Sequence, residues 1–167
     1  MTKDALLGAL AAHYGENYSA EETDAGTLPL SALYVMHIAD DRYALFRQFV
    51  TGKAESNDFV YVFTPDVLTP ELAKSCIDFA LGDGSVRIDP TGDHMFSLIT
   101  VLFFSDSIDA SAASAIKKAK MHRDYKPPQA GWAELRTAAF DLNVTLIAAN
   151  SMGRDVAVML KKAVAAK

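Results

Sequence analysis

The sequence predicts an α+β fold, in which helices pack on a mostly antiparallel sheet of five to six strands. Three strand-like runs (residues 33–39, 43–50 and 59–63) follow one another with no helix between them, which is typical of an antiparallel meander. A later run, Met95–Phe104, is apolar at successive positions and predicts a central strand covered on both faces. Strands and helices do not alternate regularly, so a doubly wound parallel sheet is not expected.

Four helices are predicted, each from a capping residue followed by apolar residues at helical spacing. They begin after Thr2, Thr69, Asp109 and Asn150 or Ser151, and they end near Gly15, Leu81, Met121 and the C-terminus. Pro70 at the first helical position strengthens the second start, because proline there loses no hydrogen bond. Gly82 then predicts a left-handed end to that helix.

The remaining segments are predicted to be strands, turns and connections. Residues 15–29 form an acidic, flexible connection, Asp40-Asp41-Arg42 a tight turn, and residues 86–88 a short strand. Residues 132–142 predict a long strand that turns at Asn143 into a second strand over 145–149. The whole chain, residues 1–167, is expected to form one domain.

Composition predicts a cytoplasmic protein that neither enters a membrane nor depends on disulfides. Cys76 is the single cysteine, so no internal disulfide can form. The N-terminus has an early acid, Asp4, and lacks the apolar core of a signal peptide. The longest apolar run, near Leu98–Phe104, is far too short to span a bilayer.

Charge is distributed unevenly along the chain. Residues 1–110 carry 17 acidic and 6 basic side chains, whereas residues 111–167 carry 4 acidic and 10 basic ones, giving the net charge of −5. The basic stretch 117–126 could bind a small anion or an acidic protein partner. Its lysines could equally complement the carbonyl end of a helix. A pI near 5.3 and the lack of a recognisable motif argue against nucleic acid.

Residues suited to catalysis or metal binding are few and scattered. His94 follows Asp93 at the start of the central strand and could act as a base or a ligand. No second His or Cys lies at ligand spacing from His94, so neither a metal nor a cofactor is expected. His37 is expected to be a hydrogen-bonded core residue, and Cys76 to be inert packing. Ser97 lacks the glycine context of a hydrolase nucleophile.

The segment Gly131–Arg136 places three functional side chains at alternate positions. Trp132, Glu134 and Arg136 project to one face of an extended strand, where Glu134 could pair with Arg136. Such a row can line a polar pocket in which arginine holds a carboxylate. It can also be an edge-strand ion pair beside a packed tryptophan.

Several short motifs resemble a family of small bacterial proteins of unknown function. The motifs are Asp93-His94-Met95-x-Ser97, Gly131-Trp132-x-x-x-Arg136, Asp141 and Asn150-x-x-Gly153, and they cover about residues 90–155. The resemblance implies a single-domain bacterial protein and no particular activity. The early order of helix, three strands and helix is also similar to the secretion-chaperone fold, whose members dimerise and bind unfolded partners.

These observations favour a non-enzymatic binding or interaction protein over an enzyme, and self-association as a homodimer is expected. The alternative is a receptor or enzyme for a small anionic ligand, and a secretion-type chaperone is a third hypothesis. The residues expected to bind such a ligand are His94, Arg123, Lys126, Trp132 and Arg136. No catalytic residue is assigned.

Overall fold

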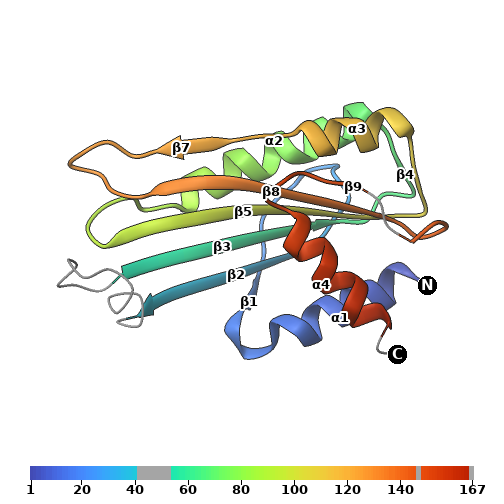
Figure 1. Cartoon of the computed structure of the whole chain (residues 1–167), viewed down its shortest axis with the longest axis horizontal. Coiled ribbons are helices and arrows are strands. Elements are labelled where there is room, and N and C mark those ends of the chain that lie inside the picture. Colours follow the sequence, from blue (N-terminus) through green and yellow to red (C-terminus); the bar gives the residue numbers. More distant parts are fainter. Residues whose placement is uncertain (41–53, 146–147, 166–167) are drawn as a thin grey trace.

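The computed structural model describes residues 1–40, 54–145 and 148–165, and it confirms the α+β class (Figure 1). The main sheet has the order β1–β2–β3–β5–β8–β7, and β9 also pairs with β8. The two central pairings, β3–β5 and β5–β8, are parallel, whereas the four outer pairings are antiparallel. The strands are β1 (Ser19–Glu21), β2 (Leu30–Asp40), β3 (Ala54–Phe63), β5 (His94–Ser105), β7 (His122–Asp124), β8 (Trp132–Asp141) and β9 (Ala148–Ala149).

The helices form one layer on each face of this sheet. Helices α2 (Pro70–Arg87) and α3 (Ala110–Lys118) cover one face, and α1 (Lys3–Tyr14) and α4 (Arg154–Ala165) cover the other (Figure 1). A short 3₁₀ helix, η1 (Gly15–Asn17), follows α1. We call these the α2/α3 face and the α1/α4 face.

The central position predicted for the strand at 95–104 is confirmed. β5 lies between β3 and β8, and its side chains alternate between two buried clusters. Ile99, Val101 and Phe103 belong to the cluster under α2 and α3, whereas Leu102 and Phe104 belong to the cluster under α1 and α4. This double burial explains why the strand is apolar at nearly every position.

Helix α2 corrects two expectations, because it passes through Gly82 and includes residues predicted to form a strand over 86–88. Its extra turns are tied to the sheet and to neighbouring loops through Asp83. That carboxylate accepts hydrogen bonds from Tyr61 Oη at 2.5 Å, Arg87 Nε at 2.8 Å and Thr23 Oγ1 at 2.9 Å. These tertiary contacts outweigh the local preference of glycine for a helix end.

The starts of α1, α2 and α3 agree closely with the sequence, whereas α4 begins later than expected. The Thr2 side chain accepts from Ala5 N, the Thr69 side chain accepts from Leu72 N, and Asp109 precedes α3. Helix α3 ends at Lys118, three residues earlier than expected, where Ala119 N bonds to Ile116 O. Helix α4 begins at Arg154, after Asn150 Oδ1 has accepted a bond from Gly153 N at 2.8 Å.

Several strands differ from the expectation or lie outside the described residues. The connection at 15–29 contains η1 and β1, and β7 is also unpredicted. The strand expected at 132–142 is β8, and β9 occupies the end of the run 145–149. The expected strand at 43–50 lies outside the described residues, as does most of the turn at 40–42.

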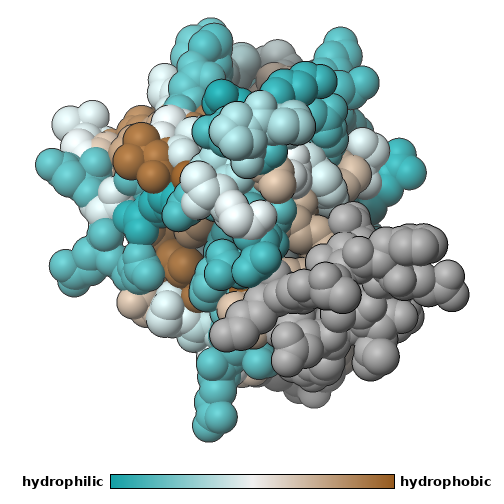
Figure 2. Space-filling model, turned by 90° about the vertical axis from the view of Figure 1, so that its left-hand side faces the viewer, coloured by the Kyte–Doolittle hydropathy of each residue, from teal (hydrophilic) through white to brown (hydrophobic). Residues whose placement is uncertain are grey.

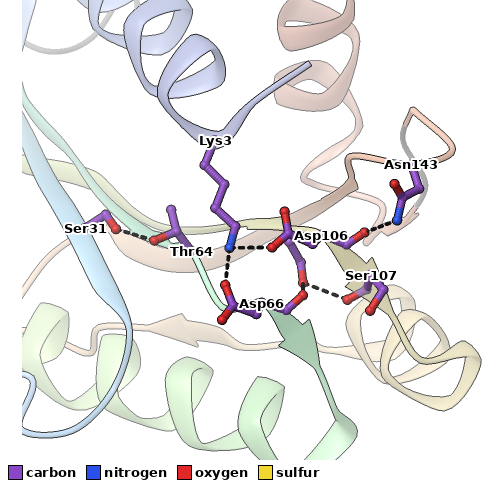
Figure 3. A network of polar contacts seen from close by, with 8 residues as sticks. Lys3, Ser31, Thr64, Asp66, Asp106, Ser107 and Asn143 are labelled. Carbon is purple, nitrogen blue, oxygen red and sulfur yellow. Dashed lines mark hydrogen bonds and ion pairs between the residues drawn. The ribbon is translucent and has the colours of Figure 1, made fainter.

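A polar network fixes the start of α1 at the carboxyl ends of the central strands (Figure 3). Lys3 Nζ lies 2.6 Å from Asp66 Oδ1 and 2.9 Å from Asp106 Oδ2, and these acids follow β3 and β5. Asn143 Nδ2 donates to Asp106 O at 2.6 Å. Hydrogen bonding to Lys3 holds the pKa of the Asp66 carboxyl below its usual value. A small parallel sheet, β4 (Val67–Leu68) with β6 (Ser107–Ile108), extends the same region.

The face of the molecule drawn in Figure 2 is largely hydrophilic where it is not grey. Figure 2 shows small apolar patches between hydrophilic side chains at the end of the molecule that lies at the left of Figure 1. The exposed large apolar side chains come from separate elements: Met1, Val67, Val86, Val144, Met152 and Val158. None of the described helices has the length and hydropathy needed to cross a membrane.

Candidate functional site

A cavity of about 290 Å³ lies on the α1/α4 face, between the two helices and β8. Its wall combines one guanidinium, two phenols and two apolar side chains with a histidine and a carboxylate: Arg136, Tyr14, Tyr18, Val156, Met159, His13 and Asp155. The cavity adjoins a groove of about 510 Å³, since His13, Asp155 and Met159 line both. It therefore has a polar floor on the sheet and apolar walls on α4.

The floor of the cavity contains a buried ion pair between β3 and β8. Arg136 Nη2 pairs with Asp58 Oδ2, and the side chains are 17 % and 2 % exposed. Thr100 of β5 lies between them, because Arg136 Nε donates to Thr100 Oγ1 at 2.9 Å and Thr100 Oγ1 donates to Asp58 Oδ1 at 2.8 Å. A buried pair offsets its desolvation only when hydrogen bonds complete it, as they do here. The guanidinium is consequently held in one orientation.

Two stacked tyrosines cover the ion pair from the end of α1. Tyr14 and Tyr18 have ring centroids 3.9 Å apart, and Tyr18 Oη donates to Asp58 Oδ2 at 2.9 Å. The Tyr14 hydroxyl is buried and has no hydrogen-bond partner within the described structure. Burial and the charge of Asp58 raise the pKa of both phenols, so each remains a protonated donor at neutral pH.

The charges around the cavity do not favour a simple anion. Asp58 neutralises Arg136 on the floor of the cavity. Asp155 adds a further carboxylate to the lining, which also includes His13, and the side chains of Asp155 and His13 are exposed. A ligand with an inward acceptor oxygen could bind the Tyr14 hydroxyl and the guanidinium. A neutral or zwitterionic molecule avoids the repulsion that a bare carboxylate would meet from Asp58 and Asp155.

His94, the first residue expected to bind ligand, lies on the opposite face of the sheet. It is 4 % exposed; its Nδ1–H donates to Ala130 O at 2.7 Å, and Nε2 lies 2.8 Å from Ser97 Oγ. Asn57 Nδ2 donates to the same Ser97 oxygen at 2.9 Å. His37 Nδ1 completes the chain by donating to Asn57 Oδ1 at 2.5 Å. His37 is itself exposed, which corrects its expected place in the core.

The pairing of Ser97 with His94 has the composition of a nucleophile and its base, but its position excludes that use. Ser97 is 0 % exposed, and its hydroxyl is held between Asn57 and His94. Cys76 is also buried, and burial raises the pKa of its thiol to about 12. In the described part of the chain, no group of three or more His, Cys, Asp or Glu side chains could hold a metal ion.

Arg123 and Lys126 both lie in the segment that follows α3, and Arg123 is linked to His94 through Tyr125. The Arg123 guanidinium lies 5.1 Å from the centre of the Tyr125 ring, and Tyr125 meets His94 edge-on at 5.6 Å. Lys126 is exposed beside the cis peptide Pro127-Pro128. The Tyr125 ring therefore lies between the Arg123 guanidinium and the His94 ring.

Trp132 and Arg136 share the α1/α4 face, as their spacing predicts. The Trp132 ring stacks on Phe96 at 5.1 Å and on His122 at 6.1 Å. The sheet separates these residues from His94, so the five expected residues do not form one pocket. The expected pairing of Glu134 with Arg136 is wrong, because Glu134 Oε2 accepts from His122 Nδ1 at 2.5 Å and Arg136 pairs with Asp58.

Sequence reasoning missed four members of this site: Tyr14, Tyr18, Asp58 and Thr100. A signal was present for two of them. Asp58 lies two and four residues before Val60 and Val62 on the same strand face, and Thr100 interrupts the most apolar run of the chain. A carboxylate and a hydroxyl at buried strand positions require polar partners. The tyrosines gave no such signal, because Tyr14 at the end of the predicted first helix and Tyr18 in the connection after it are equally suited to core packing.

Most residues of the short motifs have structural roles. Asn150 is 2 % exposed, donates to Ala119 O and Leu135 O, and accepts from Thr137 N and Gly153 N. A Cβ at Gly153 would lie 2.1 Å from Thr137 O. Gly131 has φ +82°, and a Cβ there would lie 2.4 Å from Met95 O. Arg136 is the motif residue that lines the cavity.

Comparison with known proteins extends the resemblance beyond residues 90–155. A family model matches residues 2–162, nearly the whole chain. No curated protein and no solved structure shows significant similarity to the chain. The description of the family names no activity, so no ligand or catalytic residue can be carried over from it. The chain belongs to the family described as domain of unknown function DUF8052.

Proposed function

We propose that this domain is a non-enzymatic binding protein whose ligand occupies the cavity between α1, α4 and Arg136. The ligand is a small neutral or zwitterionic molecule with an inward acceptor oxygen and an apolar side. One observation carries the proposal: Tyr14 lines this cavity, and its hydroxyl is buried and has no hydrogen-bond partner within the described structure.

An unpartnered buried hydroxyl is costly, which makes its presence informative. Leaving such a group without a hydrogen bond costs about 1–3 kcal/mol. A ligand oxygen that accepts from Tyr14 Oη recovers this free energy on binding. Arg136 supports the same ligand, because its described contacts use Nε and Nη2, whereas guanidinium carries five N–H donors.

The apolar part of the ligand is suited to the walls of the cavity. Val156 and Met159 of α4 line it, and methionine adapts to ligands of varied shape. The exposed Asp155 at the same wall favours a donor or ammonium group on the outer side of the ligand. An amide or an amino acid with an aliphatic side chain combines these features.

Three probes with one carbon skeleton test this assignment: leucine, 4-methylpentanamide and 4-methylpentanoate. They are zwitterionic, neutral and anionic, and binding is followed by NMR titration of ¹⁵N-labelled protein. We expect leucine or the amide to bind more tightly than the anion and to shift the resonances of Tyr14 and Met159. Tyr14→Phe should weaken that binding about tenfold, the equivalent of one hydrogen bond.

Tyr34→Phe is the matched control, because the Tyr34 ring lies 5.7 Å from that of Tyr14 but does not line the cavity. It should leave the affinity within about twofold of wild type. Equal affinity of wild type and Tyr14→Phe for every probe that binds, or shifts confined to other surfaces, would contradict the proposal.

Self-association and a cytoplasmic location belong to the same proposal. All residues of the cavity come from one chain, so binding requires no second copy. The buried free thiol of Cys76 supports a reducing compartment. Sedimentation velocity measures self-association directly, and a monomer that still binds the probes would separate the two parts of the proposal.

A further inference from the structure

A second cavity, about 670 Å³ in volume, lies between α3, β9 and α4 and is lined by four cationic side chains. Lys117 and Lys120 come from the end of α3 and the residues after it, and Arg154 and Lys161 come from α4. Ser151 also lines this cavity. We call this cavity the cationic cleft.

The arrangement follows from the geometry of α4. Arg154, Ala157, Val158 and Lys161 recur at spacings of three, four and seven residues, so they share one face of the helix. Asp155 lies on the other side of α4, where it lines the cavity beside Arg136. Two neighbouring residues of α4 therefore place opposite charges in different cavities.

The cations of the cleft have no acidic partners among the described residues. All four side chains are exposed, and the salt bridges of the described structure involve other lysines, arginines and His122. Four unpaired positive charges around one concavity repel one another. An anion bound between them removes that repulsion.

Complementing a helix end explains only part of this cluster. Lys117 lies in the last turn of α3, where a cation interacts favourably with the exposed carbonyls. Arg154 is the first residue of α4, where the helix dipole disfavours a cation. A positive side chain at the positive end of a helix adds to the positive potential of the cleft, which favours a bound anion.

We propose that the cationic cleft binds a small anion with several phosphate groups. Phosphate oxygens match the donors of lysine and arginine, and several negative charges are needed to balance four cations. The Ser151 hydroxyl supplies a further donor. The net charge of −5 disfavours general attraction of long polyanions, so the site is suited to a small ligand rather than a nucleic acid.

Isothermal titration calorimetry with sodium triphosphate tests the site in the full chain, with orthophosphate as the weaker reference. We expect triphosphate to bind at least about tenfold more tightly than orthophosphate, because it contacts more of the cations. Lys161→Gln should weaken triphosphate binding about fivefold or more, and Arg154→Gln combined with Lys161→Gln should abolish measurable binding.

Lys162→Gln is the matched control, since it removes the same charge one residue later and Lys162 lines the groove beside α1 instead. It should change the affinity less than about twofold. All these side chains are exposed, and a thermal melt verifies that each variant folds. Equal losses for Lys161→Gln and Lys162→Gln, absence of triphosphate binding by wild type, or tighter binding of single-stranded RNA than of triphosphate would each overturn the proposal.

Discussion

Two polar networks lie on opposite faces of the same sheet, and they differ in whether their hydrogen bonds are complete. On the α2/α3 face, the chain His37–Asn57–Ser97–His94 ends on a backbone carbonyl. On the α1/α4 face, the network around Asp58 and Arg136 borders a cavity and leaves the Tyr14 hydroxyl without a described partner. A completed buried network is accounted for by the fold, whereas an incomplete one beside a cavity points to a ligand.

The two networks also differ in charge. The α2/α3 network joins neutral amide and hydroxyl groups with two histidines. The α1/α4 network contains a carboxylate and a guanidinium, whose burial is far more costly if either loses its partner. Variants that break each network in turn test both the difference in hydrogen bonding and the difference in charge.

The largest effect is expected from breaking the buried ion pair. Asp58→Ala leaves the Arg136 charge without a partner and should lower the free energy of unfolding by about 3–5 kcal/mol. Urea denaturation measures this loss. Adding Arg136→Met should restore part of it, because no unpaired charge then remains. A double variant as unstable as the sum of both single variants would show that the pair is not coupled.

The complete network should be sensitive to loss of its central hydroxyl. Ser97→Ala deprives both His94 and Asn57 of a partner and should lower the free energy of unfolding by about 2–3 kcal/mol. Urea denaturation again provides the measurement. Ser107→Ala is a control at a half-buried strand position, and it should have a much smaller effect. A negligible change in the free energy of unfolding for Ser97→Ala would contradict the view that the α2/α3 network stabilises the fold.

A smaller loss is expected from the partnered tyrosine of the α1/α4 network. Tyr18→Phe removes a hydrogen bond to the Asp58 carboxylate and should lower the free energy of unfolding by about 1.5 kcal/mol. The effect should vanish in the Asp58→Ala background, where the acceptor is already absent. Persistence of the full loss in that background would mean that the phenol has another partner.

The weakest contribution should come from an exposed pair at the edge of the same face. Hydrogen bonds to Glu134 and Asp124 raise the pKa of the His122 imidazole above 6.5. The resulting stabilisation is present below the unfolded pKa and is lost as pH rises through the folded pKa. An NMR titration should give a His122 midpoint above 6.5 that falls in Glu134→Gln. An unchanged midpoint in this variant would contradict the assigned cause.

The sequence predicts the fold class and the main elements because they depend on local patterns. Thr2, Thr69 and the apolar run of β5 each act through near neighbours, and all three predictions are confirmed. The continuation of α2 past Gly82 depends on Asp83 meeting Tyr61 and Thr23, which are distant in sequence. Such contacts leave no local pattern.

The site is predictable only in part for the same reason. Arg136 and its shared face with Trp132 follow from strand alternation, and Arg136 does line a cavity. Its partner is Asp58, 78 residues away, rather than the nearby Glu134. Spacing along one strand cannot identify which neighbouring strand supplies a partner, because that depends on the order of strands in the sheet.

The sign of the stability change in Tyr14→Phe tests the central claim most directly, since it requires no knowledge of the ligand. If the hydroxyl is unpartnered in the ligand-free protein, replacing it with hydrogen should raise the free energy of unfolding by about 1 kcal/mol. Urea denaturation beside Tyr18→Phe, measured in the same buffer, provides the comparison. A loss of stability in Tyr14→Phe as large as that in Tyr18→Phe would show that the hydroxyl already has a partner, and the cavity would then need no ligand to complete its network.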